Sequence, residues 1–259
     1  MSLRGSPKMR DAIRALLVVC GASLLLACNP TVVRNSVSLI DLDKEWVGLY
    51  EQRLKAEREN PGTAAAINSR LADLSERAEQ HGDASESDPA TAAGFYRIAA
   101  TSAWAAGPPR NTRVLPIRDK GTAVCTKLAA DPMSQPRDCA FIRIAPELAT
   151  LDAQAAAVKT LRDAVTLSAP EFAKAEQVAS TMTQVIQRIV QERPTPGAQS
   201  TSFDEYIQLN LNRGFCMLPG LVGHVASHSP PPDQMQRIVA SAQSAQSALQ
   251  GANISTACT

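Results

Sequence analysis

Two histidines, His224 and His228, have the spacing of a metal-binding pair. Four residues apart on a helix, their rings would lie on one face and could share a cation. The segment that holds them lies between Pro219-Gly220 and Pro230, which leaves only about two turns of helix. No glutamate follows His224 as a metalloprotease motif requires. We therefore predict two surface histidines and expect no cofactor; a small-ligand or metal carrier built on this pair is an alternative.

Carboxylates occur in three clusters, at Asp41/Asp43/Glu45, at Asp83/Glu86/Asp88 and at Asp204/Glu205. Acid–base catalysis needs two such groups held across a cleft with different pKa values. These carboxylates instead lie in or just before the predicted first turns of helices, where the helix dipole favours negative charge. The sequence also contains no serine elbow and no phosphate-binding glycine loop. We predict that the chain is not an enzyme.

The N-terminal stretch from Ala15 to Cys28 is an uncharged apolar run that follows four basic residues. A basic leader, an apolar segment of about 7–15 residues and a small residue at its end are typical of a secretory signal peptide. The run from Ala15 to Ala27 is too short for a membrane-spanning helix, which needs about 20 residues. We predict a signal peptide over residues 1–27.

The end of this stretch, Leu25-Leu26-Ala27-Cys28, resembles the lipobox of bacterial lipoproteins. In that family an aliphatic residue stands three places before an invariant cysteine and a small residue directly before it, as Leu25 and Ala27 do here. The resemblance implies cleavage before Cys28 and lipidation of that residue, with an acyl chain such as palmitate on its sulfur and another on the new amino terminus. An ordinary secretory signal cut nearby and an uncleaved anchor are the alternatives.

The residue after the cysteine, Asn29, bears on which membrane the chain would occupy. In the lipoprotein family an aspartate at this place commonly signals retention in the inner membrane. The resemblance therefore favours the periplasmic face of the outer membrane, and the inner membrane is the alternative.

Four cysteines lie downstream of the lipobox, and an even number in an exported chain predicts disulfide bonds. Sequence proximity favours the pairs Cys125–Cys139 and Cys216–Cys258. The first pair would close a short loop, and the second would hold the C-terminal tail against a helix. A zinc site is the alternative, but the sequence contains no C-x-x-C pair.

After cleavage, residues 28–259 would carry a formal charge of −2, because the leader takes four basic residues and one acidic residue from a chain of net charge +1. A nearly neutral body argues against nucleic acid, whose binders cluster basic residues to displace counterions. It also offers no polybasic patch for anionic lipids, so the membrane would be a partner only through the N-terminal lipid.

The body of the chain has the composition and periodicity of helices. Alanine is abundant and aromatic residues make up only 4% of the chain, which favours an all-α fold. Apolar residues recur at steps of three and four, as at Leu39, Leu42 and Trp46, and Asp88 and Ser168 are N-cap signals before prolines. We predict stacked antiparallel helical hairpins, either tetratricopeptide-like or an irregular bundle, since each hairpin buries its apolar stripe only against a neighbour.

Prolines divide the predicted chain into parts. We expect a lipidated tether over residues 28–36, an N-terminal helical half over 37–107 and a C-terminal helical half over 147–259. Between the halves, residues 108–146 contain six prolines, which interrupt helices and strands. We predict an irregular insert there, stapled by Cys125–Cys139; a short helix around Cys125 and short strands at 114–117 and 141–144 are the elements that it could contain.

Residues 63–106 resemble one tetratricopeptide-type helix pair through Gly94-Phe95-Tyr96 and nearby small residues. The pattern does not recur at the 34-residue period of that family, so a plain amphipathic hairpin is the alternative. Helical-repeat proteins present aromatic side chains on a concave face, and Tyr96 and Trp104 flank the apolar stripe of this hairpin. They are our candidates for a partner groove, with core packing as the alternative.

These features together predict a membrane-anchored periplasmic lipoprotein that serves as a protein-binding or assembly scaffold of the cell envelope, with another envelope protein as its partner. Two other classes stay open. A cell-envelope enzyme or enzyme activator should show a deep polar cleft with a desolvated carboxylate. A small-ligand or metal carrier would use His224 and His228.

Overall fold

The computed structural model describes residues 30–128, 137–193 and 202–258, and these residues form helices without any strand. The predicted all-α fold is therefore confirmed. The elements are α2 (Pro30–Glu59), α3 (Pro61–Ala84), α4 (Pro89–Ala105), the short 3-10 helix η1 (Arg110–Arg113), α5 (Val114–Leu128), α6 (Arg137–Arg162), α7 (Ala169–Glu192), α8 (Ser202–Ala226) and α9 (Pro232–Gly251). The signal peptide predicted over residues 1–27 and the lipidation site at Cys28 lie outside the described residues.

Local sequence sets the start of several helices. At α4, a carboxylate oxygen of Asp88 accepts a hydrogen bond from the backbone N–H of Thr91 at 3.3 Å. At α7, the carboxylate of Glu171 accepts one from the backbone N–H of Ser168 at 2.6 Å. These bonds satisfy backbone donors that have no partner within the helix. Both N-cap predictions are confirmed.

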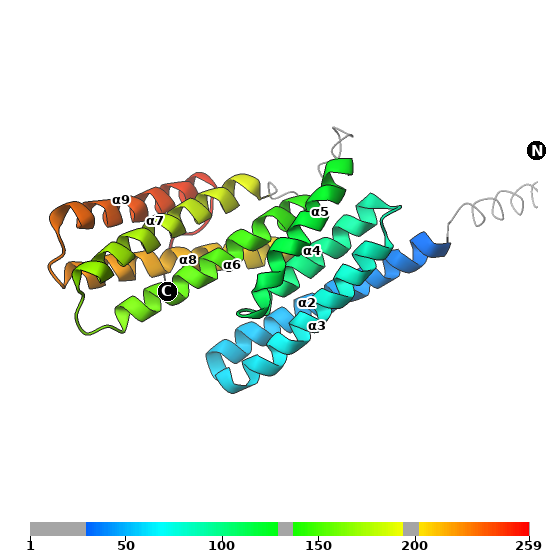
Figure 1. The fold of residues 1–259 in the computed structure, drawn as a ribbon, viewed down its shortest axis with the longest axis horizontal. Helices are drawn as coiled ribbons and strands as arrows, with labels where there is room; N and C mark the ends of the chain where they lie inside the picture. The colour runs from blue at the N-terminus through cyan, green and yellow to red at the C-terminus, as the bar shows by residue number, and fades with distance from the viewer. Residues whose placement is uncertain (1–29, 129–136, 194–201, 259) are drawn as a thin grey trace, which may run out of the picture.

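The helices form successive antiparallel hairpins, α2 with α3, α4 with α5, α6 with α7 and α8 with α9 (Figure 1). Helices α2–α5 make up one side of the molecule and α7–α9 the other. The long helix α6 runs through both sides, because it packs against α4 and α5 as well as against α7 and α8. The stacking of hairpins is as predicted, and α6 is the element that connects the two groups.

The segment 108–146 is mostly helical, which corrects the predicted irregular insert. Its described residues belong to η1, α5 and the first turns of α6. Pro116 lies in the first turn of α5, where the missing N–H has no intrahelical acceptor to lose. Residues 141–144, weighed as a strand, lie in α6, and the apolar side chains among them are buried. Pro116 is therefore compatible with the start of a helix, and Pro146 is accommodated inside α6.

The predicted tether is shorter than expected, because α2 already begins at Pro30. Proline is favoured at the first position of a helix, where its fixed backbone angle is already helical. Residues 30–36 are thus the first turns of α2 rather than an extended linker. Only Asn29 lies between Cys28 and the start of α2, and Cys28 and Asn29 both lie outside the described residues.

The two groups of helices share one continuous core. Trp46 and Tyr50 of α2 pack against Phe203 and Tyr206 of α8, and we call these four side chains the aromatic seam. The ring centroids lie 3.9 Å apart for Trp46–Phe203 and 4.8 Å apart for Tyr50–Tyr206. Large aromatic side chains dominate the burial of apolar surface in cores, so the seam fastens the first described helix to the last hairpin.

A buried arginine reinforces the same junction. Arg97 of α4 forms ion pairs with Asp43 of α2 at 2.9 Å and with Asp138 of α6 at 2.6 Å. Its guanidinium carbon also lies 4.2 Å from the ring centroid of Phe203. Charge-assisted hydrogen bonds and cation–π contacts strengthen where water is excluded, so Arg97 joins four helices at one point.

Both predicted disulfide bonds are confirmed. Cys125 of α5 is bonded to Cys139 of α6, with Cα atoms 5.8 Å apart. Cys216 of α8 is bonded to Cys258 of the C-terminal tail, with Cα atoms 5.4 Å apart. The loops that they close predict a stabilisation of about 3–4 kcal/mol for each bond, mainly through the unfolded state.

Candidate binding cleft

A cleft lies where the two groups of helices meet, and we call it the junction cleft. It has a volume of about 550 Å³ and is lined by α2, the turn between α4 and η1, η1 itself, α6 and α8. Most of its lining is apolar. The polar side chains that line it are Arg53, Glu57, Asn111, Asp152, Lys159, Asn210 and Arg213. An apolar pocket with a few convergent polar groups is the usual form of a small-ligand site.

Asp152, in the middle of α6, is the most perturbed group of the cleft. The indole Nε1–H of Trp104 donates a hydrogen bond to its Oδ2 at 2.8 Å. Burial of the carboxylate raises the pKa of Asp152 above its usual range, although Arg53 and the Trp104 bond act in the opposite direction. No described residue forms an ion pair with it. A desolvated carboxylate in a pocket is a functional-site candidate.

The arginines of the cleft are held by a different carboxylate. Arg53 Nε lies 2.9 Å from Glu57, and the same guanidinium donates to the backbone oxygen of Ala105. Arg213 of α8 lies 3.3 Å from Glu57. Lys159 of α6 is exposed and has no ion-pair partner among the described residues. The rim of the cleft therefore has an excess of positive charge.

A buried hydrogen-bonded pair, Tyr50 and Asn210, borders the cleft. The side-chain amide of Asn210 donates to the hydroxyl oxygen of Tyr50 and to the backbone oxygen of Tyr206. Burial raises the pKa of Tyr50 to about 12, so its hydroxyl stays protonated at neutral pH. The amide orientation of Asn210 is thus fixed by two acceptors, which makes this wall of the cleft rigid.

Small residues give the cleft its space. Ala155 and Ala156 of α6 line it between Asp152 and Lys159, and Gly214 lines it from α8. A methyl group on Gly214 would lie 2.8 Å from side-chain carbons of Leu151, closer than carbon atoms approach one another. Glycine at this position allows α6 and α8 to pack closely at the base of the cleft.

Tyr96 and Trp104, the predicted partner groove, are buried instead, with exposed fractions of 3% and 2%. The prediction was wrong because residues 92–105 of α4 are buried all round, so neither flank of its apolar stripe faces solvent. The Tyr96 hydroxyl donates to Asp83 at 2.6 Å and serves the packing of α3 on α4. Trp104 supports the junction cleft from behind, through its bond to Asp152.

His224 and His228 do lie side by side, with ring centroids 4.6 Å apart. Both ring nitrogens of His228 face backbone carbonyls, Nδ1 that of His224 at 2.8 Å and Nε2 that of Val165 at 3.0 Å. These contacts raise the pKa of His228. When the ring is protonated, both nitrogens donate to these carbonyls, and His228 then connects the end of α8 to the α6–α7 turn.

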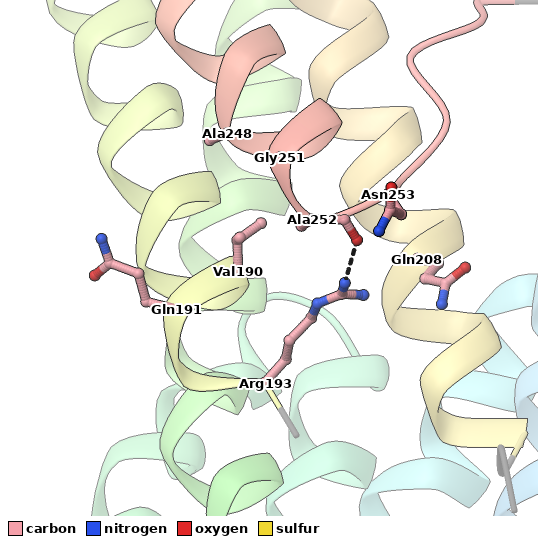
Figure 2. A pocket seen from close by; sticks show the side chains of 8 residues that line it. All are labelled: Val190, Gln191, Arg193, Gln208, Ala248, Gly251, Ala252 and Asn253. Atoms are coloured by element: carbon pink, nitrogen blue, oxygen red, sulfur yellow. Dashed lines mark hydrogen bonds between the residues drawn. The ribbon is translucent and has the colours of Figure 1, made fainter. Parts of the chain in front are cut away.

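A second hollow lies at the C-terminal ends of α7 and α9 and has a volume of about 680 Å³ (Figure 2). Its lining consists of Val190, Gln191, Arg193, Gln208, Ala248, Gly251, Ala252 and Asn253. Arg193 extends across it and donates to the backbone oxygen of Ala252 at 2.7 Å. Burial lowers the pKa of Arg193. A cation beside the C-terminal carbonyl groups of two helices offsets the negative ends of their dipoles. Arg193 therefore has a structural role at the ends of α7 and α9.

Comparisons with known proteins leave the structure as the guide to function. No protein-family model, no curated protein and no solved structure matches this chain. None of the helices in the described ranges combines the length and apolar character that crossing a bilayer requires. In the same part of the chain, no three His, Cys, Asp or Glu side chains gather in a group that could hold a metal ion.

The residues of the junction cleft were not among the predicted sites. One signal was present: Asp152 and Lys159 are seven residues apart, hence on one face of a helix, beside the apolar stripe that contains Leu151 and Val158. Charged residues next to the apolar face of a helix lie at the border between the buried core and the protein surface, where a cleft can form. The approach of Trp104 and Asn210 to this face depends on how the hairpins stack, which helical periodicity does not specify.

Proposed function

We propose that this chain is a lipoprotein of the bacterial cell envelope, fixed to the periplasmic face of the outer membrane through Cys28, and that it binds a partner or ligand in the junction cleft. The observation that carries the proposal is the pairing of all four downstream cysteines in two disulfide bonds. Such bonds persist in oxidising compartments and are rare in the cytosol. The leader and the lipobox-like Leu25–Cys28 segment support the same location.

The structure suits an anchored binding module. Since α2 begins at Pro30, acyl chains on Cys28 would be joined to the helical body through a very short connection. Two or three acyl chains hold a protein stably at a membrane, whereas one chain does so only marginally. Confinement to a membrane raises the effective concentration of protein and partner, so a cleft of modest affinity would suffice.

A cell-envelope enzyme or enzyme activator is the second candidate, and the desolvated Asp152 is the observation that favours it. The cleft supports binding better than catalysis. Of the described residues that line it, only Glu57 is a second carboxylate, and two arginines hold that group. Asp152 is therefore without the partner acid or base that paired-carboxylate mechanisms use.

The anchor is tested by intact-mass spectrometry of the protein purified from native membranes. We expect a chain that begins at residue 28 and carries the added mass of two or three acyl groups. A Cys28→Ser variant should lose the lipid and be recovered in the soluble periplasmic fraction. An unmodified Cys28 in the native protein would contradict the proposed anchoring.

The binding role is tested by crosslinking in intact cells followed by mass spectrometry. We expect a crosslinked partner that contacts residues around the junction cleft, and its yield should fall with Lys159→Glu, which reverses the charge of the rim. Lys174→Glu on α7, an exposed lysine that does not line the cleft, is the matched control and should leave the crosslink unchanged. Equal loss with both variants would argue against a role for the cleft.

A further inference from the structure

Burial in the folded protein disfavours the charged form of Asp152, and Arg53 and Arg213 offset this penalty only in part. Its carboxylate is half-buried and has no ion-pair partner among the described residues, and its Oδ2 accepts a hydrogen bond from Trp104. Asparagine could accept the same bond while staying neutral. Groups that a fold keeps at such a cost occur mainly at functional sites. The free side of this carboxylate, in a cleft, is suited to a cationic group of a ligand.

A positive charge stands at the other end of the same helix face. Lys159 is seven residues beyond Asp152 on α6, which corresponds to about 10.5 Å along the helix axis. Ala155 and Ala156 line the cleft between them, so the two charges flank a trough of small apolar side chains. Lys159 has no ion-pair partner among the described residues, and its ammonium group is available to an anion.

The opposite wall complements this arrangement. Arg213 of α8 also lines the cleft, and the carboxylate that it approaches, Glu57, is shared with Arg53. One carboxylate thus serves two guanidinium groups, which leaves net positive charge on this wall of the cleft. Asn210 lines the same wall, and its amide is fixed by Tyr50 and Tyr206.

We propose that the junction cleft binds a short zwitterionic peptide, with its free amino group on Asp152 and its terminal carboxylate toward Lys159 and Arg213. An extended peptide spans at most about 3.3–3.6 Å per residue, so two or three residues match the separation of the charges. The alanines and Gly214 favour small side chains in this peptide, and the volume of about 550 Å³ accommodates it. This inference rests on the proposed function of the cleft as a binding site.

The probe is tri-alanine with both ends free, titrated into the isotopically labelled full chain and followed by nuclear magnetic resonance. The chain contains two tryptophans, so two indole N–H signals are available. Trp104 donates to Asp152 and should shift on binding. Trp46 lies in the aromatic seam and is the internal reference that should stay in place.

Matched peptides and variants separate the two ends of the ligand. N-acetyl-tri-alanine lacks the ammonium group and tri-alanine amide lacks the carboxylate, and each should bind at least about tenfold more weakly than tri-alanine, as the loss of one charge-assisted pair predicts.

Asp152→Asn should weaken the binding of tri-alanine by a similar factor. Its midpoint of thermal unfolding should equal or exceed that of the parent, which shows that the loss is not one of folding. Lys159→Gln should weaken tri-alanine but leave tri-alanine amide unaffected, and Lys174→Gln should change neither.

Three outcomes would overturn the inference: no shift of the Trp104 signal at millimolar tri-alanine, equal affinity for the acetylated peptide, or full affinity in Asp152→Asn. None of them bears on the lipid at Cys28 or on a crosslink at the cleft. A chain that is lipidated and crosslinks through the cleft but ignores tri-alanine would keep the proposed function and remove this peptide assignment.

Discussion

Two glycines of α8 show how the surroundings of a single residue decide its role. A methyl group added at Gly214 would lie 2.8 Å from side-chain carbons of Leu151, whereas one added at Gly223 would meet nothing within 4 Å. Both residues lie inside the helix, so the gain in helix propensity from alanine is the same. Only the packing against α6 differs between them.

We expect opposite effects from the same substitution at these two positions. Gly223→Ala should raise the free energy of unfolding by about 1 kcal/mol, because alanine is the better helix former. Gly214→Ala should lower it by about 1–2 kcal/mol, since the cost of overpacking, about 1–3 kcal/mol, exceeds that gain. Urea-induced unfolding of the two variants measures the difference. Equal stabilisation by both would show that α6 and α8 are not in close contact at Gly214.

The end of α8 is held by a histidine, the side chain whose charge most often changes in the physiological pH range. The ring nitrogens of His228 face the backbone carbonyls of His224 and Val165, and these contacts raise its pKa. The ring of His224 is the titratable neighbour, 4.6 Å away. Protonated His228 thus connects the last turn of α8 to the turn between α6 and α7.

This connection should make stability depend on pH in one direction. A raised folded-state pKa gives a stabilisation that is fully present below the unfolded value of about 6.5 and is lost as pH rises through the folded value. The difference in unfolding midpoint between the parent and His228→Gln should therefore be largest near pH 5.5 and shrink by pH 9. Val165→Ala keeps the backbone carbonyl and should keep the pH dependence. A difference that stays constant across this range would contradict the assignment.

At the scale of the whole molecule, the two groups of helices are held as one body. Their buried residues form a single cluster, and the aromatic seam and Arg97 cross the boundary between them. The junction cleft is formed by elements of both groups, so its geometry depends on their being locked together. Residues 37–107 and 147–259, expected as two halves, share this core.

We therefore expect one cooperative unfolding transition rather than two. Trp46→Ala, which removes the centre of the seam, should lower the unfolding free energy by about 3–5 kcal/mol and lower the midpoint for both groups of helices together. Ile40→Ala on the same helix removes a side chain that is 55% exposed and should change stability by no more than about 0.5 kcal/mol. Scanning calorimetry distinguishes the cases, and two resolved transitions in the parent would contradict a shared core.

Much of this architecture was predictable because its causes are local. Helix caps at Asp88 and Ser168 act within three residues, and the apolar periodicity of a helix repeats within two turns. The cysteine pairs were predicted from short sequence separations, 14 and 42 residues. Part of the error over residues 108–146 has a local cause as well, since Pro116 was weighed as a breaker without regard to its place in the first turn of a helix.

The candidate site, in contrast, depends on contacts between residues that are far apart in the sequence. Trp104 and Asp152 are 48 residues apart, and Tyr50 and Asn210 are 160 apart. Sequence periodicity states which face of a helix is apolar but not which helix will cover it. For the same reason Tyr96 and Trp104 were assigned to a groove, although α4 is covered on every side.

The sequence by itself thus determined the helices, the cysteine pairs and the expectation of an anchored exported chain, because hydrogen bonding along a helix and the closing of loops depend on neighbours in the chain. Only the tertiary structure decided which carboxylate would be partly withdrawn from water. Desolvation of Asp152 requires α2, α6 and α8 to meet around it, and that meeting is set by the packing of aromatic and small residues far apart in sequence.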